Sequence, residues 1–87
     1  MTPVLITTNN RGVYYGYMVE NNAPEMVRLD KARVVVQWDT PKGFLQMAVE
    51  GPQGVAEVSP AVGSMEVYGV ATIADCSLEA AEAWDAA

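Results

Sequence analysis

The sequence contains no histidine and a single cysteine, Cys76, among its 87 residues. Without histidine the chain cannot build a Ser–His or Cys–His nucleophile system, and one cysteine cannot complete a closed zinc site. A lone cysteine also leaves no internal disulfide, which is typical of proteins from a reducing compartment. We therefore expect a cytoplasmic, non-enzymatic protein with no cofactor and no metal. A metal-assisted phosphodiesterase built from carboxylates, Tyr and Lys stays open, although the acids form no recognisable cluster.

Long apolar runs are also missing, since none approaches the ~18 residues of a membrane-spanning helix. The start, Met1-Thr2-Pro3, lacks the positive and apolar segments of a secretory signal. The apolar fraction of 51% is nevertheless too high for a disordered chain. We expect one domain over residues 1–87 with one modest core and no membrane contact. Small cores often gain apolar area by self-association, so we expect a homo-oligomer.

Bases are scarce, with five Lys plus Arg against eleven Asp plus Glu and a net charge of −6. All the bases lie in residues 1–50, whereas residues 51–87 carry only acids among their charged side chains. Net acidity makes binding to a long nucleic-acid backbone unfavourable. The base-bearing first half still leaves room for one small anionic ligand.

Runs of β-branched and aromatic residues, separated by Asn, Gly and Pro turns, predict short strands. These lie at residues 4–8, 13–20, 25–29, 32–38, 55–58 and 65–74. Thr40-Pro41 and Gly51-Pro52 bound a predicted helix over residues 41–50, and a terminal helix follows over 78–84. The pattern predicts an α+β fold with one inserted helix and one C-terminal helix. Its sheet would be a bent antiparallel meander or a small SH3-like, partly open barrel of five or six strands.

Side-chain alternation predicts which faces are buried. In residues 13–20 the expected core face is Val13, Tyr15, Tyr17 and Val19. In residues 32–38 it is Ala32, Val34, Val36 and Trp38. The first helix should bury Phe44, Met47 and Ala48, with Leu45 and Val49 widening the stripe. The terminal helix should bury Leu78, Ala81 and Trp84.

Residues 11–18 followed by 25–33 resemble the first three-strand meander of Sm-like barrels, whose rings bind RNA. The second, RNA-reading motif of that family, with its basic residue and glycine, is absent from residues 65–70. RNA binding therefore does not follow from this resemblance.

A longer resemblance covers nearly the whole chain. Its elements are Gly12-Val13-Tyr14-Tyr15-Gly16, Lys31-Ala32-Arg33, Trp38, residues 45–51, and Ile73-Ala74-Asp75-Cys76-Ser77 before an Ala/Glu-rich helix. In this order they are similar to a family of short phage and prophage proteins of unassigned function. A Ser-Gly-containing turn usually follows the tryptophan there, whereas this chain has residues 39–43, Asp-Thr-Pro-Lys-Gly. The resemblance implies viral origin and action in the cytoplasm of a host bacterium, and it implies no activity.

Several bases are candidate anion ligands. Arg33 could form a fork-like anion site with Arg28 on the same face, although strand charges paired with glutamates across the meander are the more ordinary account. Lys42 lies at the predicted helix start, where free N–H groups could hold a phosphate, although a simple cap explains the same residues. Gln46 lies one turn further along that helix face.

The aromatic residues near these bases could stack on a ligand ring. Tyr15, Tyr17 and Trp38 lie on predicted core faces, which favours packing. Tyr14 lies on the other face and is the better candidate for stacking.

We therefore hypothesise a phage-encoded, oligomeric counter-defence protein that sequesters a nucleotide-derived immune signal of cyclic ADP-ribose or cyclic dinucleotide type. Arg11, Arg33 and Lys42 would meet phosphates, Tyr14 or Trp38 would stack, and Gln46 would lie beside them. One alternative is an acidic decoy, in which residues 57–85 bind a basic host nuclease or CRISPR effector. A further alternative is a structural or assembly accessory of the virion.

Overall fold

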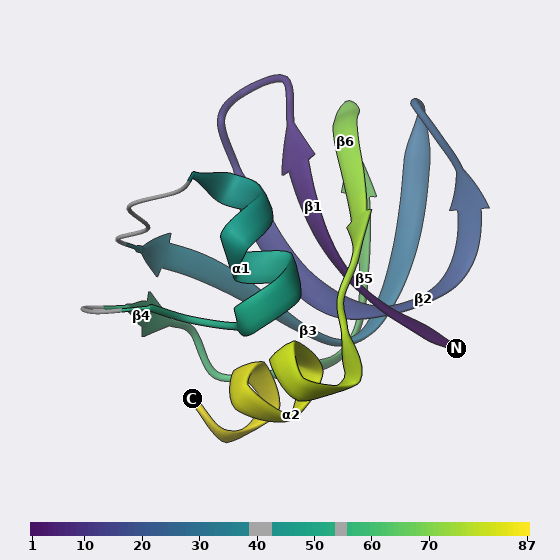
Figure 1. The fold of residues 1–87 in the computed structure, drawn as a ribbon. Coiled ribbons are helices and arrows are strands. Elements are labelled where there is room, and N and C mark those ends of the chain that lie inside the picture. The colour runs from purple at the N-terminus through teal and green to yellow at the C-terminus, as the bar shows by residue number, and fades with distance from the viewer. Residues whose placement is uncertain (39–42, 54–55) are drawn as a thin grey trace.

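The computed structural model describes residues 1–38, 43–53 and 56–87 (Figure 1). Along the chain its elements are β1 (Thr2–Thr8), β2 (Val13–Asn22), β3 (Met26–Gln37), α1 (Phe44–Glu50), β4 (Glu57–Val58), β5 (Val62–Tyr68), β6 (Val70–Asp75) and α2 (Leu78–Ala86). The strands form one antiparallel, open, six-stranded sheet. The inserted helix and the C-terminal helix complete the α+β fold and confirm the predicted class.

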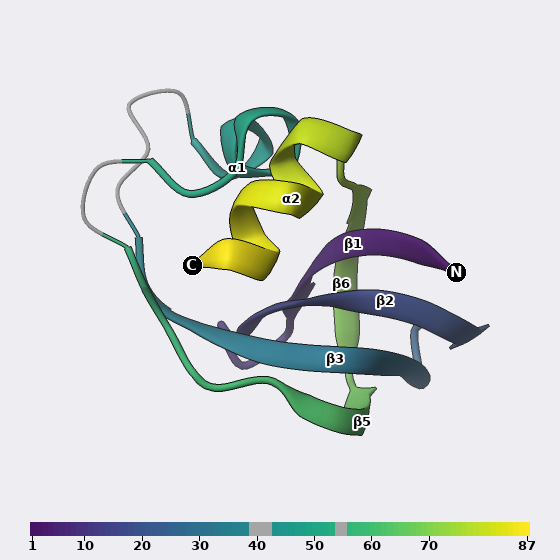
Figure 2. The ribbon, with the colours of Figure 1, turned by 90° about the horizontal axis from the view of Figure 1, so that it is seen from below.

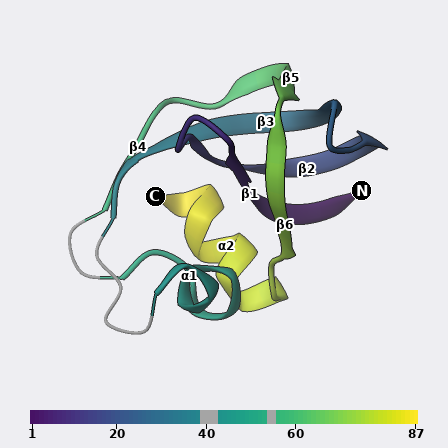
Figure 3. The ribbon, with the colours of Figure 1, turned by 90° about the horizontal axis from the view of Figure 1, so that it is seen from above.

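The sheet is curled, because β3 is long enough to pair with three strands. The strand order is β4-β3-β2-β1-β6, and β5 also pairs with β3. β6 crosses the open side of the curl, from the end of β5 to β1 (Figures 2 and 3). In the described part of the chain no ladder joins β5 to β6, so the sheet remains open.

The curled sheet is buried on both faces. On one face α1 and α2 cover a helix-side cluster, which consists of Leu5, Val13, Tyr15, Val35, Met47, Ala48, Ala80 and Trp84. Inside the curl lies an inner cluster, which consists of Val4, Ile6, Val27, Leu29, Ala32, Val67 and Val70. Instead of the single core that we expected, the chain thus builds two apolar clusters with one strand layer between them.

The face prediction for β2 holds for Val13 and Tyr15, which are buried on the helix side. Tyr17 is only partly buried at the edge of the same cluster. Val19 is exposed, which corrects its predicted place in the core. The register with β3 shifts between Met18 and Glu20, so Val19 is an extra residue outside the regular alternation of β2.

The face prediction for β3 is correct for Ala32 and wrong for Val34, Val36 and Trp38, which are exposed. Lys31, at φ 52°, is the extra residue of a bulge, because Tyr15 pairs with Arg33 whereas Tyr17 pairs with Asp30. The bulge shifts the alternation, so that Val35 faces the helix-side cluster. The face of β3 that contains Ala32 continues past the curled part of the sheet, and there its side chains are exposed to solvent.

Helix α1 buries a narrower stripe than we predicted. It begins at Phe44 after Gly43, whose φ of 88° suits glycine, whereas the predicted start at Thr40-Pro41 lies outside the described residues. Met47 and Ala48 are buried, but Leu45 and Val49 are exposed. A helix of only seven residues therefore contacts the sheet along one stripe and presents the rest to solvent.

Helix α2 is capped by Ser77, whose Oγ accepts from the Ala80 N–H at 3.0 Å. The same hydroxyl donates to the Val49 carbonyl at 2.6 Å, so the cap also joins the two helices. Trp84 donates from Nε1 to the Met47 carbonyl at 3.1 Å. Leu78 is 76% exposed, so its predicted burial is wrong. Ala80 is buried in its place.

Arg33 holds the C-terminal end of α2 against the sheet. Its Nε donates to the Ser59 carbonyl at 2.8 Å, Nη1 to the Trp84 carbonyl at 2.7 Å, and Nη2 to the Ala87 carbonyl at 2.6 Å. The last carbonyls of a helix lack intrahelical donors and carry partial negative charge, so a guanidinium stabilises them. Arg33 is therefore a structural clamp in this fold.

We predict that replacing Arg33 with Met lowers the free energy of unfolding by ~2–3 kcal/mol, because charged hydrogen bonds to three carbonyls are lost. Urea denaturation followed by circular dichroism measures this change. The matched control is Arg28→Met, which removes an exposed ion pair to Glu66 and should cost only ~0–1 kcal/mol. Equal effects of the two substitutions would contradict the clamp.

Candidate functional site

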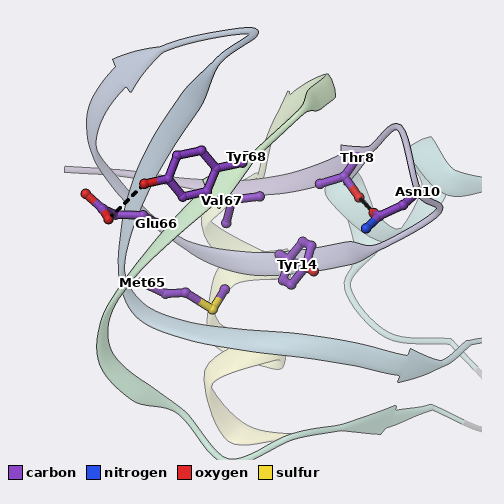
Figure 4. Close-up of a pocket in the computed structure, with 7 residues that line it drawn as sticks. All are labelled: Thr8, Asn10, Tyr14, Met65, Glu66, Val67 and Tyr68. Carbon is purple, nitrogen blue, oxygen red and sulfur yellow. Dashed lines mark hydrogen bonds between the residues drawn. The ribbon is translucent and has the colours of Figure 1, made fainter.

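A hollow of about 240 Å³ lies where the turn after β1 meets β5 (Figure 4). We call it the first hollow, and its lining is Thr8, Asn10, Tyr14, Met65, Glu66, Val67 and Tyr68. A second hollow of about 250 Å³ adjoins it and is lined by Asn9, Asn10, Tyr68 and Gly69. Mouths of curled sheets and barrels are frequent places for small ligands.

The turn over residues 9–12 is held by several backbone contacts. The Thr8 N–H donates to the Gly12 carbonyl at 3.0 Å, and the Arg11 N–H donates to the Thr8 carbonyl at 3.1 Å. The Thr8 hydroxyl accepts from the Gly12 N–H at 3.0 Å and donates to the Asn10 side-chain oxygen. A Cβ at Gly12 would lie 2.7 Å from the Tyr14 ring, so only glycine fits beside it. The turn is thus fixed before any ligand arrives.

Tyr68 is exposed, but its orientation is set by a chain of polar contacts. Its hydroxyl donates to Glu66 Oε1 at 3.1 Å (Figure 4). Glu66 in turn lies 2.9 Å from Arg28 Nη2, and Arg28 Nη1 donates to Ser64 at 3.2 Å. The hydrogen bond to the Glu66 carboxylate raises the pKa of Tyr68 above its ordinary value, so the phenol stays protonated. Arg28 offsets the charge of Glu66, which leaves this wall polar.

The structure brings two of the predicted ligand residues, Arg11 and Tyr14, into the same region. Tyr14 lines the first hollow and also packs against the inner cluster. Arg11 is exposed in the turn, directly after Asn10, and its φ of 68° lies in the left-handed region. Its side chain makes no hydrogen bond or ion pair with the residues that the structure describes.

Three other predicted ligand residues, Arg33, Trp38 and Gln46, do not line these hollows. Arg33 is bonded to α2, Trp38 follows the last residue of β3, and Gln46 is partly buried on α1. Lys42 lies outside the described residues. The proposed pair of Arg33 and Arg28 also does not form, because each guanidinium has its own separate partners.

The bases in the described part of the chain therefore differ in how they are used. Arg28 pairs with Glu66 and, at 3.8 Å, with Glu20. The Lys31 ammonium lies 5.6 Å from the centre of the Tyr17 ring, a cation–π contact. With Arg33 bonded to carbonyls, Arg11 is the described base that keeps its donors for solvent or a ligand.

Thr8, Asn10, Glu66 and Tyr68 were not predicted as site residues. Asn10 belongs to a turn that the sequence does indicate, and Tyr68 precedes Gly69, where a bend was predicted. These are separate local signals. They meet only because the Asn9 N–H donates to the Gly69 carbonyl at 2.9 Å, a contact between distant segments.

A second group of polar side chains lies between β2 and α2. The Tyr15 hydroxyl donates to Asp85 at 3.0 Å and lies 3.2 Å from the Ala81 carbonyl, and Tyr17 donates to the other Asp85 oxygen. Burial, and then hydrogen bonding to Tyr17 and Asp85, raises the pKa of Tyr15 far above its ordinary value. Tyr15 also stacks on Trp84, with ring centres 5.8 Å apart. This group fastens α2 to the sheet.

Cys76 lies at the edge of the helix-side cluster. Burial raises the pKa of its thiol to about 12, and the negative charges of Asp75 and Asp85 add to the shift. A thiol with this pKa is not a reactive nucleophile at neutral pH.

Neither helix in residues 1–38, 43–53 and 56–87 has the length and apolar content to cross a bilayer. Within those same residues, His, Cys, Asp and Glu do not gather in groups of three or more that could hold a metal ion.

Residues 1–84 match a family model described as "Domain of unknown function (DUF6948)". Because the match covers nearly the whole chain, the chain belongs to this family. No curated protein and no solved structure matches the chain.

We predict that stability falls as the pH rises above 9, the ordinary pKa of the Cys76 thiol. Above pH 9 the unfolded chain loses this proton while the folded chain keeps it until about 12, so folding becomes less favourable. In Cys76→Ala the fall should begin only near pH 10, where tyrosines of the unfolded chain ionise. Urea midpoints measured from pH 7 to 11 test this, and identical profiles between pH 9 and 10 would contradict it.

Proposed function

We propose that this member of the DUF6948 family is a non-enzymatic protein that binds a small nucleotide-derived ligand beside the turn over residues 9–12. The observation that carries the proposal is the position of Arg11. It is the described base without a protein partner, and it lies in the same turn as Asn10, which lines a hollow with Tyr14 and Tyr68. Aromatic rings for a base and a guanidinium for a phosphate are the groups that a nucleotide requires.

The size of the first hollow suits one ring system. Its volume of about 240 Å³ is below the ~300–1,000 Å³ of pockets that enclose drug-sized ligands. The Asn10 amide can donate to and accept from a base edge, and the Tyr68 hydroxyl can accept. Because Arg28 balances Glu66, the carboxylate does not by itself exclude an anionic ligand.

The same charges favour a small anion over a nucleic acid. A nucleic-acid surface normally neutralises many phosphates, each with its own Lys or Arg. Here Arg28, Lys31 and Arg33 already have partners within the protein, and the whole chain carries a net charge of −6. One free guanidinium can meet one phosphate group.

For the biological role, we propose a phage-encoded protein that acts in the cytoplasm of a bacterial host. By binding without turnover, it would lower the free concentration of a nucleotide-derived immune signal, of cyclic ADP-ribose or cyclic dinucleotide type. The resemblance to short phage and prophage proteins supports this role. Homo-oligomer formation stays a prediction.

The acidic decoy is the second candidate. It is favoured by Glu79 and Glu82, which are exposed on α2 and make no ion pair with described residues. Asp85 does not belong to such a surface, because Tyr15 and Tyr17 donate to it. The virion accessory stays a prediction from the sequence.

We predict that isothermal titration calorimetry detects binding of at least one ligand among cyclic ADP-ribose, cyclic di-AMP, cyclic di-GMP, AMP and GMP. Arg11→Asn should weaken that binding about tenfold or more, because a charge-assisted hydrogen bond is lost. Asparagine tolerates the left-handed backbone at this position, so the fold is kept.

The control is the double variant Glu79→Gln/Glu82→Gln, which should bind the ligand as the wild type does. If none of the five compounds binds, or if Arg11→Asn binds as tightly as wild type, the proposed site is wrong. Loss of a host-protein interaction in the double variant alone would support the decoy instead.

A further inference from the structure

Tyr68 and Asn10 line both hollows, whereas the remaining lining residues belong to one hollow each. Tyr14 and Met65 lie on the side of the first hollow, and Asn9 and Gly69 on the side of the second. Tyr68 and Asn10 therefore form the boundary between two spaces of nearly equal volume, about 240 and 250 Å³. From this division we infer that the site takes a ligand with two planar rings, one on each side of Tyr68.

Tyr68 is suited to be such a partition, because it is exposed and held in place. Its exposed fraction is 65%, which agrees with a side chain that stands out from the strand (Figure 4). Its hydroxyl donates a hydrogen bond to Glu66, and Glu66 accepts a hydrogen bond from Arg28 on the neighbouring strand, β3. An aromatic ring that is already oriented loses little conformational entropy when bases stack on it.

The second hollow is open to a ring on the side of Gly69, which has no side chain to fill it. Gly69 has φ 67° and no side chain, and a Cβ there would contact only Asn9 Nδ2, at 3.7 Å. The Asn9 N–H is fixed to the Gly69 carbonyl at 2.9 Å, so this wall is rigid. The Asn9 amide supplies polar atoms for the edge of a second base.

Arg11 is the residue that we expect to bind the phosphate between the two rings. It follows Asn9, which lines the second hollow, and Asn10, which lines both. A phosphate that joins the two nucleosides would then meet the one described guanidinium that has no partner. The inference rests on the proposed function and narrows it to dinucleotides, such as cyclic di-AMP or cyclic di-GMP, in preference to cyclic ADP-ribose.

The test compares two-ring with one-ring ligands by calorimetry, using cyclic di-AMP and cyclic di-GMP against AMP and GMP. The wild type should bind one of the dinucleotides about tenfold or more tightly than the matching mononucleotide, because a second base is stacked. Asn9→Trp fills the second hollow from an exposed turn position. In this variant the dinucleotide affinity should fall to that of the mononucleotide, which itself should not change.

The control is Leu78→Trp, which adds a similar ring at an exposed position on α2, and circular dichroism checks that both variants are folded. If dinucleotide and mononucleotide bind equally in the wild type, or if only cyclic ADP-ribose binds, the two-ring inference fails while the proposed function stands. If no nucleotide binds at all, the proposed function fails. Equal loss of both ligands in Asn9→Trp would also overturn the two-ring inference.

Discussion

The pairing of β6 with β1 is the contact on which both cores and the candidate site depend. β1 lies between β2 and β6, and its residues Val4, Leu5 and Ile6 are fully buried. Fully burying each such side chain is worth roughly 1.5–3 kcal/mol, so this strand contributes strongly to stability. The same pairing places β6 across the open side of the curl, where it covers the inner cluster.

The register of that pairing also determines the geometry of the hollows. Ile6 lies opposite Ile73, the register shifts after Thr7, and Thr8 lies opposite Val70. The strand then ends in the turn over residues 9–12, whose Asn9 N–H reaches the Gly69 carbonyl between β5 and β6. Without this contact, the turn that carries Asn10 and Arg11 would have no fixed position relative to Tyr68. The site is therefore a consequence of how the sheet closes.

Local patterns in the sequence predicted strands and two helices, but they placed some boundaries wrongly and did not predict the pairing of distant segments. The strands predicted at residues 25–29 and 32–38 are one strand, β3, and the strand predicted at residues 65–74 is divided into β5 and β6. The Gly51 stop and the C-terminal helix are local features, and they appear close to where they were expected. The Lys31 bulge changes the phase within β3, and no single residue in that run indicates it.

The site was predicted only in part, because some of its residues are marked by local patterns and others meet only through the pairing of distant segments. Tyr14 and Arg11 could be chosen from the sequence because the alternation placed one on the strand face opposite Tyr15 and the other lies in a turn. Tyr68 could not, because Asn10 and Tyr14, which line the first hollow with it, lie more than 50 residues earlier in the chain. Arg33 also resembles a free strand charge in the sequence, although its acceptors on Trp84 and Ala87 lie more than 50 residues further along the chain.

The uneven charge distribution has a structural explanation in this fold. The second half of the chain wraps around the first, so that β5 places Glu66 beside Arg28, and α2 places its last carbonyls beside Arg33. Asp85 is bound by two tyrosine hydroxyls of β2. Two acids of the acid-rich half, Glu66 and Asp85, are thus matched by groups of the base-bearing half. Arg11 stays available because its turn faces neither an acid nor the end of a helix among the described residues.

Tyr14 and Tyr15 show how the fold separates stability from binding. They are neighbours in β2, and strand alternation sends them to opposite faces of the same layer. Tyr15 stacks on Trp84 and bonds to Asp85, so it fastens α2. Tyr14 lines the first hollow, on the face away from both helices. Substitutions around Arg11 or Tyr68 would therefore change the proposed site and leave the helix-side cluster, which carries the largest buried side chains, intact.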